Sequence, residues 1–395
     1  MTKLAPSPVS VAIGGLITLA VAMGYGRFVY TPILPFMIDQ SVVDPSEAGL
    51  IATANYAGYL LGALLAARIT LPGGIKTWFV WALSTSVVTT ALMGLVDGAV
   101  VFGVIRFISG LASAFSFVLA SSMVFAWLAK ARADHLTGLY FAGVGTGIAV
   151  SAAMVSLIGD ADTHWRTFWY YSGFFSVLGL IAAYILVPAP SRSEAGVPDA
   201  EPSLKMSWPI MRLIVAYGLF GFGYVITATF ISTIARQDPA LQPLEPYVWL
   251  LVGVSAAPSV SLMVLVARRL GNRRTLGLAC LLEAAGVAVS VLGGTPLLLA
   301  IGAILLGGTF VGITAIGLFE ARQLASASPR RALGYMTASF GLGQMIGPGV
   351  ASQFYDLHQD FFLASVCASV ALVFAAILVF WKVAPERPTT VTTNL

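Results

Sequence analysis

Charged side chains are scarce in this chain of 395 residues. Asp, Glu, Lys and Arg make up only 10% of it, whereas 58% is hydrophobic and the mean hydropathy is +0.89. A water-soluble domain has about a quarter of its residues charged, and a chain this apolar would expose large hydrophobic patches to water. The composition therefore excludes an ordinary soluble enzyme. The length suits an all-α membrane protein with about twelve helical spans.

Cysteine and histidine are also rare. Cys280 and Cys367 lie inside apolar stretches, and the three histidines occur singly in polar connections, so we expect neither a disulfide framework nor a metal site. The Gly-x-x-x-x-Gly-Lys-[Ser/Thr] motif is absent, which leaves no loop of this kind to couple ATP hydrolysis to movement. We expect no cofactor, no metal, no nucleic-acid partner and no enzymatic activity.

Apolar stretches between polar breaks predict twelve membrane-spanning helices. The expected ranges are 9–36, 46–68, 76–95, 98–128, 135–158, 166–187, 207–235, 247–267, 275–293, 296–319, 332–354 and 361–381. Twelve spans place both termini on one side. If that side is the cytoplasm, the outer segments hold only Arg166 and Arg236 as basic residues, and the inner segments hold nearly all the others. The positive-inside rule therefore predicts cytoplasmic termini.

Glycine motifs recur at a nearly constant spacing of 197 or 198 residues. The pairs are 24–26 with 221–223, 143–145 with 341–343, and 110 with 308. Such parallel repeats predict two six-helix bundles, at 1–187 and 207–395, joined by a cytoplasmic linker at 188–206, with a binding site between them near mid-membrane. The alternative is that Gly-x-Gly pairs are simply common where membrane helices pack closely.

Several motifs are typical of one family. The fourth span contains Arg106-x-x-x-Gly110-x-x-x-Ala114, and the sixth opens with Trp-Arg-x-Phe at 165–168. Together with the six-plus-six plan, these motifs resemble the major facilitator superfamily over the whole chain. Residues 24–35, with the sequence GYGRFVYTPILP, are similar to the first-helix signature of its YbfB/YjiJ-type branch. Ala66 departs from the superfamily pattern, which has Asp there, so an inner-face charge lock at that position is in doubt.

Ionisable side chains inside the predicted spans are the main functional candidates, because burying a charge in lipid costs at least ~2.5 to 3.5 kcal/mol. Arg27 lies about 27 Å along the first helix at 1.5 Å per residue. Pro32 and Pro35 follow it and should free carbonyls and bend the helix toward a cavity. The guanidinium suits a carboxylate or a phosphate. The alternative is that Arg27 extends to the outer headgroups.

Three further charges lie within the spans. The resemblance implies that Arg106 is a cavity or coupling residue, and the alternative is an interhelical donor to backbone carbonyls. Glu283 is near mid-depth in the ninth helix and Glu320 is near the inner end of the tenth. Both are candidates for proton coupling or gating. The alternatives are a structural acid for Glu283 and an inner salt bridge for Glu320.

Polar aromatic and amide side chains on the predicted cavity helices complete a substrate-binding set. Its members are Arg27, Tyr30, Asn55, Tyr56, Tyr59, Arg106, Tyr140, Tyr224 and Gln344.

These observations predict a secondary active transporter in the bacterial inner membrane. We expect a monomer that carries a small organic anion or zwitterion by alternating access, coupled to protons. One alternative is a proton-driven exporter of apolar or drug-like compounds. Another, of a different class, is a membrane sensor or a lipid flippase on the same fold.

Overall fold

The computed structural model describes residues 6–66, 74–160, 162–189 and 202–381. Regular structure in these ranges is helical throughout. The elements are α1 (Pro8–Leu19), the π-helix η1 (Ala20–Phe28), α2 (Tyr30–Asp39), α3 (Pro45–Ala66), α4 (Ile75–Leu92), α5 (Ala99–Lys130), the 3₁₀ turn η2 (Asp134–Leu136), α6 (Thr137–Ile158), α7 (Trp165–Leu186), α8 (Trp208–Gln237), the 3₁₀ turn η4 (Gln242–Leu244), α9 (Glu245–Leu270), α10 (Asn272–Leu292), α11 (Pro296–Leu324), α12 (Pro329–His358) and α13 (Phe362–Phe380).

Each predicted span corresponds to one helix, if α1, η1 and α2 are taken as a single span from Pro8 to Asp39. The observed ends lie within about five residues of the expected ones, as is usual for helix boundaries. Within the described ranges, 10 helices are long and apolar enough to cross a membrane. The all-helical fold is thus confirmed, whereas twelve crossings and cytoplasmic termini stay predictions.

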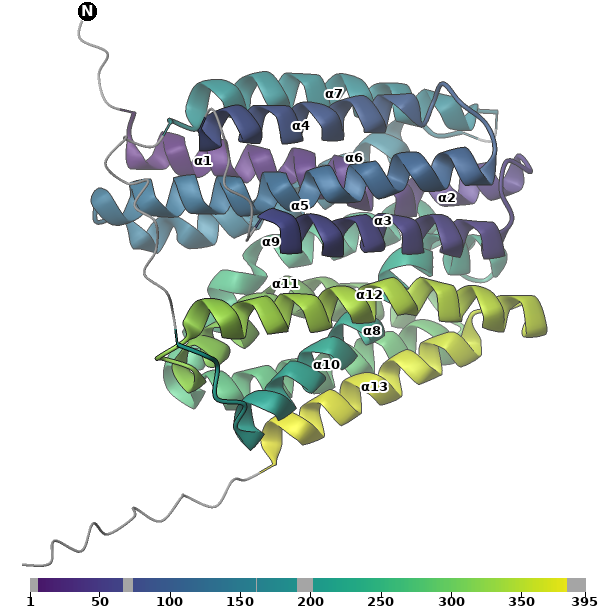
Figure 1. Cartoon of the computed structure of the whole chain (residues 1–395). Coiled ribbons are helices and arrows are strands. Elements are labelled where there is room, and N and C mark those ends of the chain that lie inside the picture. Colours follow the sequence, from purple (N-terminus) through teal and green to yellow (C-terminus); the bar gives the residue numbers. More distant parts are fainter. Residues whose placement is uncertain (1–5, 67–73, 161, 190–201, 382–395) are drawn as a thin grey trace, which may run out of the picture.

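The helices form two groups, α1–α7 above and α8–α13 below in Figure 1. The groups meet where α6 packs against α9 and α3 packs against α12. The domain boundaries predicted from the repeat stay a prediction, since residues 190–201 of the expected linker lie outside the described residues. Helix α1 begins and α13 ends at the same end of the molecule, which we call the Pro8 end. The opposite end, where α2 stops, is the Asp39 end.

Small residues allow the helix backbones to approach closely. A Cβ atom on Gly110 of α5 would overlap the carbonyl of Asn55 in α3, and one on Gly145 of α6 would overlap the backbone of Ala257 in α9. Close packing through small residues is the usual way to associate helices in lipid. Gly110 thus fixes a contact inside one half, and Gly145 fixes one between the halves.

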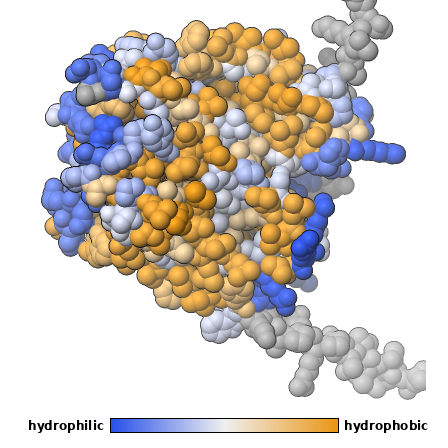
Figure 2. Space-filling view, turned by 180° about the vertical axis from the view of Figure 1, so that it is seen from behind, coloured by the Kyte–Doolittle hydropathy of each residue, from blue (hydrophilic) through white to orange (hydrophobic). Residues whose placement is uncertain are grey.

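The molecular surface carries an apolar belt between two polar ends (Figure 2). Large apolar side chains such as Trp81, Val100, Leu157 and Ile185 are exposed. Exposed apolar area of this extent is favourable only in lipid. The chain is therefore a multi-pass membrane protein.

Candidate functional site

The first span is interrupted at its centre by the π-helix Ala20–Phe28, and α2 begins at Tyr30. Prolines explain part of this break. Pro32 has no N–H, so it cannot pair with the carbonyl of Arg27 at the i→i+5 spacing of a π-helix. The carbonyl of Arg27 is therefore freed as expected, whereas the wide helical segment was not predicted and a bend toward the cavity stays a prediction.

Side chains of α5 take up the freed carbonyls. Arg106 donates from Nη1 to the carbonyl of Gly26 at 2.8 Å and from Nη2 to that of Arg27 at 2.6 Å. The Ser109 hydroxyl also donates to Gly26, and Asn55 of α3 donates to the carbonyl of Arg106. Arg106 therefore acts as an interhelical donor, the alternative given above. Its role as a substrate ligand stays a prediction.

The side chain of Arg27 is buried in an aromatic setting. Its guanidinium carbon lies 4.1 Å from the ring centroid of Tyr59, 4.5 Å from that of Tyr56 and 5.3 Å from that of Phe28. Only 3% of Arg27 is exposed, so it does not extend to the headgroups. Aromatic faces stabilise a cation, but they do not neutralise it.

One edge of this guanidinium is unpaired. Nε and Nη2 of Arg27 are buried and have no hydrogen-bond partner, and no described carboxylate pairs with the residue. These two nitrogens point their N–H groups in nearly the same direction, as a fork that matches the two oxygens of a carboxylate. The site can therefore accept one anion at this edge.

The opposite wall belongs to the second half and is aromatic. Tyr224 of α8 stacks on Phe310 of α11 at 5.4 Å and on Phe340 of α12 at 5.8 Å between ring centroids. Phe28 meets Phe310 edge to face at 6.1 Å, which connects the two halves. Gln344 donates to the Tyr224 hydroxyl, and its Oε1 atom is buried without a partner. Sequence analysis missed all three phenylalanines, because Phe is common throughout the spans.

A small cavity of about 10 Å³ lies beside Arg27, between the halves. Tyr30, Asn55, Tyr56 and Arg106 are among its lining residues. The structure thus brings together six of the predicted site residues from the first half, including Tyr59 over the guanidinium. Tyr224 and Gln344 lie across from them in the aromatic wall.

Tyr140 is not part of this group. Its hydroxyl bonds with the hydroxyl of Ser121 at 2.7 Å and with the carbonyl of Phe117, both in α5. These partners place the polar end of Tyr140 inside the first half, and its role as a substrate ligand stays a prediction.

The two candidate acids also lie elsewhere. Glu283 is fully buried in α10, which packs against α11 and α13. Its carboxylate lies beside the Thr309 hydroxyl of α11, but that hydroxyl donates to the carbonyl of Leu305, so neither carboxylate oxygen accepts a hydrogen bond within the described residues. Glu320 lines a separate pocket of about 180 Å³ together with Arg212 and Arg273. That pocket is lined by residues of the second half alone. Neither Glu320 nor Glu283 lines the cavity beside Arg27.

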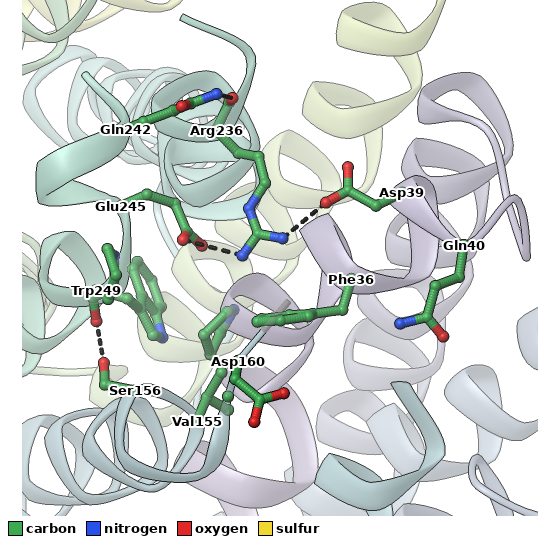
Figure 3. A pocket seen from close by; sticks show the side chains of 13 residues that line it. Phe36, Asp39, Gln40, Val155, Ser156, Asp160, Arg236, Gln242, Glu245 and Trp249 are labelled. Atoms are coloured by element: carbon green, nitrogen blue, oxygen red, sulfur yellow. Dashed lines mark hydrogen bonds and ion pairs between the residues drawn. The ribbon is translucent and has the colours of Figure 1, made fainter. Parts of the chain in front are cut away.

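A larger cavity of about 540 Å³ opens near the Asp39 end (Figure 3). Arg236 of α8 crosses it, with 2.7 Å to Asp39 of α2 and 3.0 Å to Glu245 of α9, above the ring of Phe36. We call this group the Arg236 bridge. It was not predicted, although Arg236 is one of only two basic residues expected on an acidic face. Such an isolated cation could have indicated a pairing role.

Other polar contacts between the halves gather at the same end. The hydroxyl of Ser46 donates to Asp356 at 3.0 Å, and that of Ser156 donates to the carbonyl of Pro246. Asp160 also lines the larger cavity, but it pairs within its own half: the Thr163 hydroxyl donates to it and holds the pKa of this exposed carboxyl below its usual value. Polar contacts therefore join the two halves across the Asp39 end.

Comparison with known proteins gives one family match. The sequence model of the family described as "Uncharacterised MFS-type transporter YbfB" matches residues 19–380. The MFS-type transporter YceJ of Bacillus subtilis is 27% identical over 226 residues, which are 55% of this chain and 56% of that relative. The chain thus matches about half the length of YceJ.

Two putative tartrate transporters of Agrobacterium vitis align over most of the chain. One is 25% identical over 384 residues, covering 88% of this chain and 84% of the relative. The other is 25% identical over 377 residues, covering 86% of each. The crystal structure of the nucleoside transporter NupG matches 95% of this chain with a TM-score of 0.71 and 17% identity, and covers 99% of that protein. This likeness shows the shared fold.

Proposed function

The chain belongs to the YbfB-type family of major facilitator transporters, and on this premise we propose that it carries a small organic anion or zwitterion as a secondary active transporter. The family and the fold are those of transporters, which are not enzymes. We place it, as a monomer, in the inner membrane of a bacterium.

The unpaired edge of Arg27 is the observation that carries the anion assignment. A buried charge without a counter-ion is costly, and a carboxylate at this edge would remove that cost. Hydrogen bonds to charged groups contribute about 1.5 to 3 kcal/mol. The similarity to putative tartrate transporters supports an organic anion as the cargo.

Alternating access would move this site from one side of the membrane to the other. The Arg236 bridge and the serine contacts at the Asp39 end hold the halves together there. We propose that these contacts break when the Asp39 end opens, and that the halves then close at the Pro8 end. We propose that Glu320, which lines a pocket with Arg212 and Arg273, takes part in gating at that end.

Protons are the proposed driving ion, with Glu283 as the coupling group. An ionised carboxylate with no partner at such depth would cost several kcal/mol. We therefore propose that Glu283 holds a proton in this conformation and releases it when the second half rearranges. The alternative function, a proton-driven exporter of apolar compounds, would use the same coupling group. The aromatic wall is the observation that supports this alternative.

Direct binding tests the anion assignment. Purified protein would be screened by thermal shift against organic anions, since a ligand at a hundred times its Kd stabilises by about 2.7 kcal/mol. Arg27→Ala should then weaken binding of the best anion by about 10- to 150-fold, and Arg27→Lys should restore only part, because an ammonium lacks the planar fork.

Folding of each variant would be checked by size-exclusion profile. If Arg27→Ala binds every anion as tightly as the parent, the anion assignment is wrong. Tighter binding of apolar compounds by Arg27→Ala would instead favour the exporter.

A further inference from the structure

We infer that the cargo at Arg27 is an aromatic monocarboxylate with a hydrogen-bond donor on its ring. This inference rests on the proposed function and narrows it to one chemical class. Three features of the central site carry it: the number of cationic groups that are available, the aromatic surfaces around them and the buried acceptors without partners.

The site offers one free position for a carboxylate. Arg27 and Arg106 are the cations among the described residues that line the central cavity. Both terminal nitrogens of Arg106 already donate to backbone carbonyls of the first span. The Nε and Nη2 edge of Arg27 is an open two-pronged fork, whereas Arg106 leaves a single atom, Nε, without a partner. A second carboxylate on the same cargo would have no such fork to bind.

The surroundings of that edge suit a flat apolar body. Tyr56 and Tyr59 already cover the guanidinium, so the cargo would extend past it toward Phe28 and the aromatic wall. There the rings of Tyr224 and Phe310 are nearly parallel, at 9°. Aromatic rings at these separations pair favourably with one another. As the halves move apart, a planar ring can enter this array and replace contacts that the separation breaks.

Two buried acceptors at the site call for a donor. The Oδ1 atom of Asn55 and the Oε1 atom of Gln344 have no partner, while the amide nitrogens of both side chains are engaged with Arg106 and Tyr224. An unsatisfied buried acceptor costs free energy that a ligand hydroxyl or amino group would recover. Neither oxygen can serve a second carboxylate.

Tartrate has the opposite chemistry, with two carboxylates and no apolar body. One carboxylate could pair with Arg27, but the other would lie unpaired among the rings of Phe28, Phe310 and Tyr224, where burial of an unpaired charge is costly. The central site therefore selects against a small dicarboxylate, even though the sequence is similar to putative tartrate transporters.

Isothermal titration of the purified full chain with four probes tests this inference. We expect 4-hydroxybenzoate to bind at least about 10-fold more tightly than L-tartrate, because tartrate leaves one charge unpaired. Its neutral analogue 4-hydroxybenzamide should bind about 10- to 150-fold more weakly than the acid. Benzoate, which lacks the ring donor, should bind about 2- to 13-fold more weakly.

A matched pair of variants isolates the aromatic wall. Phe310→Leu keeps an apolar side chain but removes one ring, and should weaken binding of 4-hydroxybenzoate about 2- to 12-fold. Phe361→Leu removes a buried ring of the same half that stacks on Phe230 at 4.4 Å, outside the site. It should leave the affinity unchanged, which separates lost stacking from general destabilisation.

The outcomes separate the inference from the proposed function. If tartrate binds more tightly than 4-hydroxybenzoate and Arg27→Ala removes that binding, the aromatic class is wrong and the anion carrier stands. Equal effects of Phe310→Leu and Phe361→Leu also overturn the aromatic class. If no carboxylate probe binds, or if binding is insensitive to Arg27→Ala while the variant folds, both the inference and the anion assignment fail.

Discussion

The first helices of the two halves share a glycine motif but differ in chemistry just after it. In the first half Gly24 and Gly26 are followed by Arg27, and in the second half Gly221 and Gly223 are followed by Tyr224. The same offset of 197 residues therefore relates the buried cation to the centre of the aromatic wall. The repeated fold has divided the site, so that one half supplies the charge and the other supplies the rings.

The backbones at these equivalent places also differ. The first span contains a π-helix with Pro32 and Pro35 after it, whereas α8 runs without a break from Trp208 to Gln237. Thr229 and Ser232 stand where the prolines would be repeated. Of these two equivalent helices, the first span therefore has the freed carbonyl and the hydrogen bonds from Arg106, and α8 has an unbroken helix. A comparison of the halves by substitution should show how far this division extends.

The largest effect is expected at Glu283, a fully buried acid of the second half. Glu283→Gln should abolish accumulation of the transported anion driven by a proton gradient, yet leave exchange across proteoliposomes intact. Exchange requires reorientation of the loaded carrier but no net proton release. Glu320→Gln tests the other candidate acid, which lines a pocket with Arg212 and Arg273. If both variants accumulate the anion like the parent, protons are not coupled at either acid.

Smaller effects, on the free energy of unfolding, are expected at Gly110 and Gly308, which are related by the repeat. The two substitutions should differ in sign. Gly110→Ala should lower the free energy of unfolding by about 1 to 3 kcal/mol or more, because its Cβ atom would overlap the α3 backbone. An added Cβ at Gly308 meets no atom within 4 Å among the described residues. Gly308→Ala should therefore leave the protein unchanged or stabilise it by about 0.5 to 1 kcal/mol.

Thermal unfolding in detergent measures both variants. Equal destabilisation by the two substitutions would contradict the difference in packing between the halves.

The smallest effect is expected at the Arg236 bridge. Asp39→Asn removes one arm of a partly exposed pair, worth about 0.2 to 1 kcal/mol, so opening at the Asp39 end should rise by no more than about 5-fold. The reaction rate of a cysteine at buried Thr31 with an impermeant thiol reagent reports this opening, in a background without Cys280 and Cys367.

Asp160→Asn is the matched control for the bridge. It lines the same cavity but pairs within its own half. A rate increase as large in Asp160→Asn as in Asp39→Asn would show that the cavity charge, and not the bridge, governs opening.

Features that depend on composition and spacing could be predicted from the sequence. Apolar runs located the helices. The residues near Arg27 on the first two spans were identified because a charged side chain in lipid is expected to contact polar or aromatic side chains. Tyr140 was grouped with them from its helix alone, and the structure shows its hydroxyl bonded to α5, so its part in binding stays a prediction. The aromatic wall and the Arg236 bridge depend on how two halves dock, and no local pattern contains that information.

The hydrogen bonds from Arg106 and Ser109 to the carbonyls of Gly26 and Arg27 reduce the entropy that the backbone would lose on binding. Fixing the backbone of one residue costs about 1 to 2 kcal/mol. The carbonyls of Gly26 and Arg27 are held by side chains of α5, so the protein itself fixes this wide helical stretch of the first span. Capture of the cargo then does not have to order this backbone, and more of the interaction energy remains available as affinity.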